Sequence, residues 1–79
     1  MENRAVRKQH CAQIGANLRS IRKDRGMTQE QLAGMLGSSK QVLSRYERGE
    51  RCLTLSTAAQ YAHCLRIPLS ALTDGLFKV

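Results

Sequence analysis

The chain has 79 residues, of which 42% are hydrophobic and only three, two Tyr and one Phe, are aromatic. This length suits one domain with a single, largely aliphatic core. Thirteen Lys and Arg against six Asp and Glu give a net charge of +7, which favours a polyanionic partner. No apolar run approaches the ~20 residues that a membrane span needs, and the N-terminus lacks a secretory signal. We therefore expect a cytoplasmic protein without a membrane partner.

The cysteines Cys11, Cys52 and Cys64 are odd in number and far apart in the sequence. Without a secretory signal, this pattern favours reduced thiols over a disulfide. We expect Cys11 and Cys64 to be small core residues. His10 and His63 each precede a cysteine, but neighbouring helical residues diverge by about 100° and chelate poorly. The sequence predicts no metal site and no cofactor.

The first predicted helix carries an apolar stripe at spacings of three and four residues. Its members are Cys11, Ile14, Leu18 and Ile21. Gly26 ends this helix, because a left-handed residue commonly follows a helix C-terminus. Residues 1–12 are either an N-terminal extension or the start of the same helix.

A capping box marks the start of the second predicted helix. Thr28 can accept from the backbone N–H of Gln31, and the Gln31 side chain can reach back to Thr28. The helix is short and ends at Gly37. Its apolar residues are Leu32, Met35 and Leu36.

The third predicted helix is capped by Ser38 or Ser39 and ends at Gly49. The turn before it is so short that the second and third helices must cross steeply. Ala33 supplies the small side chain that a close crossing needs. The residues expected to pack across the crossing are Leu32, Leu36, Leu43 and Tyr46.

Thr54 or Ser56 caps a fourth helix, and Pro68 lies in the first turn of a fifth helix that ends at Gly75. The residues of the fourth helix expected to face inward are Leu55, Ala58, Ala59, Ala62 and Leu65. No segment shows sustained β alternation. The sequence therefore predicts one compact all-α domain of five short helices over residues 1–79.

One face of the third predicted helix is strongly polar. At about 100° per residue, its polar side chains fall within one arc of roughly 140°. They are Lys40, Gln41, Ser44, Arg45 and Arg48. Three cations, an amide and a hydroxyl supply donors that match acceptors on guanine, adenine and phosphate. A merely solvated helix face is the alternative explanation.

The segment from Ile14 to Leu72 resembles the lambda-repressor-like (Xre/Cro-type) helix-turn-helix family. The resemblance rests on "LRSIRKDRGMTQEQLA", on Gly37 in the turn, and on "SRYERGER". It implies a five-helix lambda-repressor-like fold whose second and third helices form the helix-turn-helix. The "LTLSTA" stretch also resembles restriction–modification controller proteins.

The resemblance implies that the third helix is the recognition helix. The expected base-reading residues are Ser39, Lys40, Gln41, Ser44 and Arg45. The expected phosphate-contacting residues are Gln29, Arg22, Arg48 and Arg51. Arg22 and Glu47 also match an ion pair that ties the first helix to the third. Three residues depart from the family pattern. Val42 stands where relatives more often carry Thr, Ser or Tyr, Leu53 replaces a common Pro, and Arg66 replaces a common Gly after the fourth helix.

The basic residues Arg4, Arg7 and Lys8 leave two interpretations open. They form either a solvated N-terminal turn or an arm that touches DNA phosphates. The solvated turn is the first interpretation, and the arm is its alternative.

The sequence predicts a sequence-specific DNA-binding transcriptional regulator, a repressor or controller-type protein, and no arrangement of catalytic groups suggests an enzyme. One recognition helix covers only about four or five base pairs, so we expect a homodimer on a palindromic operator of double-stranded DNA. Apolar residues near the C-terminus exceed what one small core can hide and are the expected dimer interface. They are Leu69, Leu72, Leu76, Phe77 and Val79. The alternative is an antitoxin-type module that binds a protein partner and touches DNA secondarily.

Overall fold

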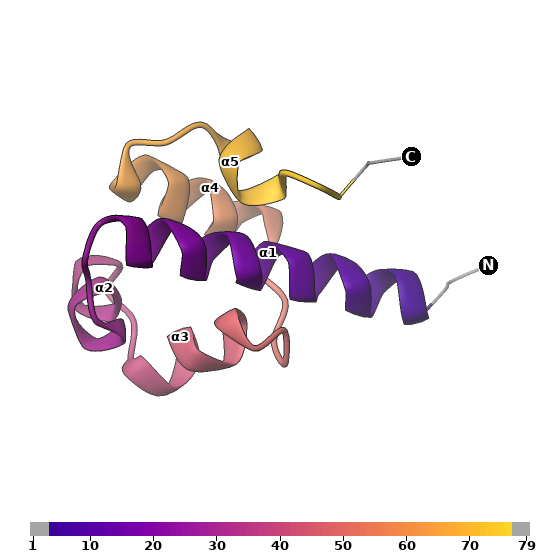
Figure 1. Ribbon diagram of the computed structural model, residues 1–79, viewed down its shortest axis with the longest axis horizontal. Helices are drawn as coiled ribbons and strands as arrows, with labels where there is room; N and C mark the ends of the chain where they lie inside the picture. The colour runs from indigo at the N-terminus through magenta and orange to yellow at the C-terminus, as the bar shows by residue number, and fades with distance from the viewer. Residues whose placement is uncertain (1–3, 77–79) are drawn as a thin grey trace.

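Five helices make up the computed structural model, which describes residues 4–76, with side chains from residue 6 onward (Figure 1). They are α1 (Arg4–Asp24), α2 (Gln29–Met35), α3 (Lys40–Glu47), α4 (Leu55–Leu65) and α5 (Leu69–Thr73). α1 runs across the middle of the molecule, with α2 and α3 on one side and α4 and α5 on the other (Figure 1). Residues 4–76 contain no strand, and the predicted all-α class with five helices is confirmed.

α1 begins at Arg4, so its first turns belong to the helix and are not a separate extension. Its apolar stripe faces the core: Leu18 is fully buried, and Ile14 and Ile21 pack against the core from its edge. The N-terminal turns of α1 project past the end of α3 (Figure 1).

The helices begin where the sequence offers capping residues. Thr28 and Gln31 form the predicted capping box, in which Gln31 N donates to Thr28 Oγ1 at 3.1 Å and Thr28 N donates to Gln31 Oε1 at 2.8 Å. Ser39 caps α3 and Thr54 caps α4, each by accepting from the backbone N–H three residues on. These caps give partners to N–H groups that a helix start otherwise leaves without one.

A single core of mainly aliphatic side chains lies among the helices. Its fully buried members are Leu18, Leu32, Leu43, Leu65 and Leu72. Tyr46 and Tyr61 meet edge to face in this core, with ring centroids 6.1 Å apart. Burial of one such leucine contributes about 1.5–3 kcal/mol, so each of these side chains matters to the stability of a chain this short.

Two residues of α4 predicted to face inward are exposed, Leu55 at 75% and Ala59. Leu55 is the first residue of α4, and the tilt of its Cα–Cβ bond toward the N-terminus directs the side chain past the end of the core. Ala59 follows the buried Ala58 and is therefore turned about 100° away from it. Cys64 is next to the buried Leu65 and is likewise turned about 100° away from it. It is therefore exposed, not in the core as predicted.

Cys11 and Cys52 form a disulfide, so the prediction that both are reduced thiols is wrong. Their Cα atoms lie 4.9 Å apart although 41 residues separate them in the sequence. Tertiary packing of α1 against the loop between α3 and α4 brings the two residues together, and sequence spacing carries no sign of it. The disulfide ties α1 to the segment that follows α3.

The turn between α4 and α5 is built on Arg66, which takes the left-handed conformation with φ 56°. Its backbone N–H donates to the carbonyl oxygens of Ala62 and His63, which closes α4. α1 supports this half of the molecule through polar contacts. The Asn17 side chain donates to the Leu72 carbonyl within α5 and to the Asp74 carbonyl just after it, both at 2.8 Å. Arg25 donates to the carbonyl of the last α4 residue.

Candidate nucleic-acid interface

α2, the turn after it and α3 form a helix-turn-helix unit. Gly37 takes φ 67° directly after the C-cap of α2, and Ser38 N donates to the Ala33 carbonyl at 2.8 Å. Ala33 is 2% exposed, in agreement with the small side chain expected where the helices cross. Leu32 on α2 and Leu43 on α3 are both fully buried in the core. Buried contacts therefore fix the angle at which α3 is presented.

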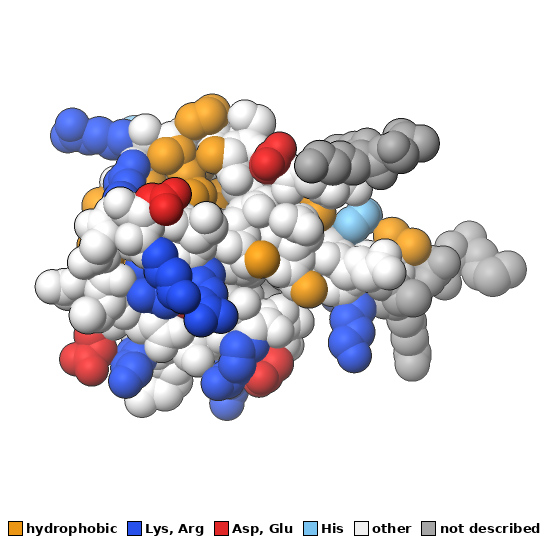
Figure 2. Space-filling view, in the orientation of Figure 1, with side chains coloured by type: hydrophobic (Ala, Val, Ile, Leu, Met, Phe, Trp, Pro, Cys, Tyr) orange, Lys and Arg blue, Asp and Glu red, His pale blue; other side chains and the backbone are white. Residues whose placement is uncertain are grey.

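The outer side of α3 is one continuous polar surface, called here the α3 face. Its side chains line a shallow depression and are Lys40, Gln41, Ser44, Arg45 and Arg48. Lys and Arg side chains lie along the lower edge of Figure 2, where Figure 1 places α3. Ser39 lies exposed at the N-terminal end of the α3 face, with its hydroxyl accepting from Val42 N at 3.2 Å.

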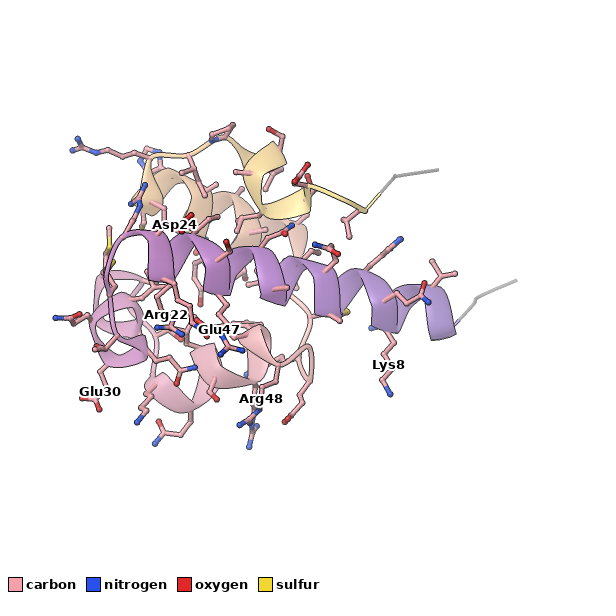
Figure 3. The ribbon with its side chains drawn as sticks, in the orientation of Figure 1. Lys8, Arg22, Asp24, Glu30, Glu47 and Arg48 are labelled. Carbon is pink, nitrogen blue, oxygen red and sulfur yellow. A yellow bond between two sulfur atoms is a disulfide. The ribbon has the colours of Figure 1, made fainter. Side chains whose placement is uncertain are left out.

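The opposite side of α3 holds the buried carboxylate of Glu47, whose side chain is 2% exposed. Arg22 on α1 binds it with two hydrogen bonds, Nε to Oε2 at 2.8 Å and Nη2 to Oε1 at 3.1 Å (Figure 3). Gln29 on α2 donates to the same Oε1 at 3.1 Å, and Arg22 Nη1 donates to the Met27 carbonyl at 2.9 Å. One carboxylate thus connects α1, α2 and α3, and the ion pair implied by the family resemblance is present.

Arg22 and Gln29 are also predicted to contact phosphates. Both line a second depression beside the α3 face, together with residues at the start of α2 and with Lys40. The Arg22 side chain is only 12% exposed, and its guanidinium is engaged within the protein. This geometry favours an orienting role for Arg22 over a direct phosphate contact. Gln29 is half-buried, and its phosphate contact stays a prediction.

Arg48 and Arg51 lie at the end of α3, on either side of the turn at Gly49. Arg48 Nε pairs with Glu50 Oε2 at 2.8 Å, with side chains 57% and 56% exposed. Such an exposed pair contributes little and is readily exchanged for another anion. Arg51 lies over the Tyr46 ring, 5.6 Å from its centroid. Both guanidinium groups are accessible, and their phosphate contacts stay predictions.

Of the described residues predicted to form the dimer interface, only some are accessible at the surface. Leu72 is fully buried in the core of its own protomer, so the prediction that it lies in an interface is wrong. It faces inward because it anchors α5 against the rest of the domain. Leu69 and Leu76 are half-buried, and Phe77 and Val79 lie outside the described residues.

Tyr61 on α4 contacts the turn of the helix-turn-helix unit. Burial raises the pKa of its phenol, and a hydrogen bond with the Ser38 side chain opposes this rise. The nearby Tyr46 raises the pKa further, and Arg51 lowers it. Ser38 lies in the turn before α3, so this contact connects α4 to the turn.

Two other features, a metal-binding cluster and a membrane-spanning helix, are absent from the described part of the chain. Residues 4–76 contain no group of three His, Cys, Asp or Glu side chains that could hold a metal ion. Within the same range, no helix is long and apolar enough to cross a membrane.

Two close contacts of α1, one with α3 and one with the turn after it, were not expected from the sequence. A Cβ atom added to Gly15 would lie 2.0 Å from the Tyr46 carbonyl oxygen, and one added to Gly49 would lie 2.8 Å from the Ala12 Cα. The backbones therefore touch at both places. The available signal was Gly15 itself, because a glycine inside a helical pattern lowers stability relative to alanine and can have a packing reason.

Comparison with known proteins places the chain in a family. Residues 18–72 match the HTH_3 helix-turn-helix family. The chain belongs to this family. A relative from Sinorhizobium fredii, the uncharacterized HTH-type transcriptional regulator y4dJ, is 37% identical over 54 residues, which cover 68% of this chain and 70% of the relative. The family implied by the sequence resemblance is thereby confirmed.

Solved structures of HTH_3 relatives share the fold. An HTH_3 family transcriptional regulator from Vibrio cholerae matches with a TM-score of 0.78 and 33% identity over 84% of this chain, but only 37% of its own. The restriction–modification controller protein C.AhdI from Aeromonas hydrophila matches with a TM-score of 0.72 and 31% identity, over 78% of this chain and 94% of its own. The HTH_3 protein is thus a transcriptional regulator with a helix-turn-helix fold.

Proposed function

We propose that this HTH_3 protein binds DNA sequence-specifically and reads its operator through α3. The observation that carries the proposal is the division of α3 into two unlike sides. The α3 face is exposed and rich in donors, whereas Glu47 on the other side is buried and bound by Arg22 and Gln29. A basic helix that is merely solvated does not need a fixed orientation. A helix that reads base edges does, and the Glu47 carboxylate supplies it by connecting α3 to α1 and α2.

The donors of the α3 face differ in the DNA groups that they can bind. The Arg45 guanidinium matches O6 and N7 of one guanine, and the Gln41 amide matches N6 and N7 of one adenine. Arg48 and Arg51 lie at the end of α3, where they suit phosphates, which are the same at every base. Base reading is thus assigned to α3 from Gln41 to Arg45, and anchoring to the residues that follow Glu47.

We expect the bound protein to be a homodimer on a palindromic operator. α3 has eight residues and is therefore about 12 Å long, which spans about four base pairs. Two-fold pairing doubles that reading length, with half-sites about 34 Å apart or a multiple of it. The half-buried Leu69 and Leu76 are the described residues that remain candidates for the interface.

A repressor or controller type of regulator fits the chain best. The controller protein C.AhdI matches over 94% of its own length and 78% of this chain. The relatives are regulators, and we assign no catalytic role to any residue. The cytoplasmic location is retained because the DNA is there, although the Cys11–Cys52 disulfide removes the argument from reduced thiols.

The test is selection of duplexes from a random DNA library by the purified chain, followed by affinity measurements across a salt series. Arg45→Ala should lose about 1–3 kcal/mol on the selected duplex and much less on random DNA. Arg51→Ala should weaken both alike and make the salt slope shallower by about one unit. If selection enriches no sequence, the proposal is rejected. If Arg45→Ala weakens both duplexes equally, the α3 face anchors DNA without reading it.

A further inference from the structure

The N-terminal part of α1 carries positive charge beyond the segment that defines the family. The family match begins at residue 18, whereas α1 begins at Arg4. Residues 4–17 thus lie outside the match although they form most of the longest helix. Among them, Lys8 is exposed.

One side of this part of α1 is held against the end of α3 at three successive points. Cys11 is bonded to Cys52 in the loop after α3. Ala12 touches Gly49 in the turn at the end of α3, and the backbone of Gly15 meets a carbonyl oxygen of α3. A covalent bond and two backbone contacts therefore fix which side of α1 faces the end of α3.

Lys8 belongs to the same side of α1. It precedes Ala12 by four residues and Gly15 by seven, which places it within about 40° of both around the helix axis. It lies about 6 Å beyond Ala12 along the helix. Figure 3 shows its side chain pointing to the same side of the molecule as Arg48.

The dimensions of the DNA groove agree with this placement. The major groove is about 8.5 Å deep, and packed helices lie about 8–10 Å apart. When α3 lies at the floor of the groove, α1 packed behind it therefore lies near the level of the phosphates. A lysine that projects from α1 past the end of α3 then meets the sugar–phosphate backbone beside the groove.

We propose that Lys8 contacts a backbone phosphate outside the base pairs that α3 reads, with the clamped N-terminal part of α1 as its rigid support. This inference rests on the proposed function, because it names a second contact with the same DNA. A phosphate contact adds affinity and fixes the position of the protein on the duplex, but it adds no preference for one base.

The test first removes the charge of Lys8 and then moves it around the helix at unchanged net charge. Lys8→Gln removes it, and Lys8→Gln combined with Gln9→Lys turns it by about 100°. Position 9 lines a depression with Gly75 and Leu76, away from α3. Arg66→Gln is the matched control, because it removes one exposed charge from the turn between α4 and α5, across α1 from α3 (Figure 1).

Affinity for a random-sequence duplex of about 30 base pairs is measured across a salt series, with far-UV circular dichroism as the check of folding. Lys8→Gln should make the slope of log K against log salt shallower by about 0.9 and weaken binding several-fold at low salt. The relocated lysine should not restore either quantity, and Arg66→Gln should leave the slope unchanged. Restoration by the relocated lysine, or an equal effect of Arg66→Gln, would overturn the proposal. Because random DNA reports no base preference, this result is independent of the selection that tests the proposed function.

Discussion

The Cys11–Cys52 disulfide should supply a large share of the stability of this domain. It closes a loop spanning 41 residues of sequence separation, which encloses α2, α3 and the C-terminal part of α1. In the chain-entropy description, closing a loop of this length removes about 13 cal/mol/K from the unfolded state, or about 4 kcal/mol at 25 °C. Small domains have a total unfolding free energy of only about 5–15 kcal/mol. The reduced chain should therefore be only marginally folded.

The assay is urea and thermal unfolding of the oxidised chain and of the same chain reduced by a phosphine. Reduction should lower the unfolding free energy by about 4 kcal/mol and the melting temperature by roughly 15–30 °C. Cys64→Ser is the control, because this exposed thiol takes no part in the bond and its loss should change stability by less than about 0.5 kcal/mol. A loss below about 1 kcal/mol on reduction would refute the reasoning, since the loop would then be equally confined without the bond.

Three further substitutions test separate parts of the structure. Glu47→Ala leaves the Arg22 guanidinium buried without its carboxylate and should lower the unfolding free energy by about 3–5 kcal/mol; an unchanged melting temperature would contradict this. Because burial raises the pKa of Tyr61, its contribution to stability is complete below about pH 10 and is lost as pH rises through the higher folded-state value. Tyr61→Phe should remove that alkaline loss, which urea midpoints on either side of pH 10 would reveal. Arg66→Gly should raise the unfolding free energy by about 1 kcal/mol, because a left-handed residue with a side chain costs about 1–2 kcal/mol. A lower melting temperature would show that the Arg66 side chain makes contacts that offset this strain.

Local features of the fold were predictable because they depend on neighbouring residues. The capping box at Thr28 and Gln31 and the stop at Gly37 are decided within a few residues, and both are present. The α3 face was predictable for the same reason, because helical periodicity alone groups its side chains. Helix phase was less reliable at the ends, and Leu55 shows why: a side chain in the first turn can point past the core.

Contacts between distant segments were not predictable in the same way. Cys11 and Cys52 meet because α1 packs over the end of α3, and no local pattern encodes that approach. The pairing of Arg22 with Glu47 was available only through resemblance to a family, since their types and spacing alone fit many arrangements. Leu72 shows the same limit, because an apolar residue near a terminus suits a core and an interface equally well until its neighbours are known.

Gly34 and Gly15 both lie inside helices, yet the structure assigns them opposite responses to the same substitution. Alanine is favoured over glycine in a helix interior by about 1 kcal/mol, which applies to both positions. A Cβ atom at Gly34 would find nothing within 4 Å, so Gly34→Ala should raise the unfolding free energy by about 0.5–1 kcal/mol. Urea unfolding measures this gain.

At Gly15 the added Cβ would lie 2.0 Å from the Tyr46 carbonyl oxygen, and a backbone atom cannot turn aside as a flexible side chain can. α1 must then move away from α3, which disturbs the Arg22–Glu47 pair and the disulfide together. Overpacking of this kind typically costs about 1–3 kcal/mol, which exceeds the gain in helix propensity. Gly15→Ala should therefore unfold at lower urea than the parent chain and bind DNA more weakly, whereas Gly34→Ala keeps its affinity. If Gly15→Ala proves as stable as Gly34→Ala, α1 and α3 are not in backbone contact, and the rigid placement of Lys8 beside the DNA loses its basis.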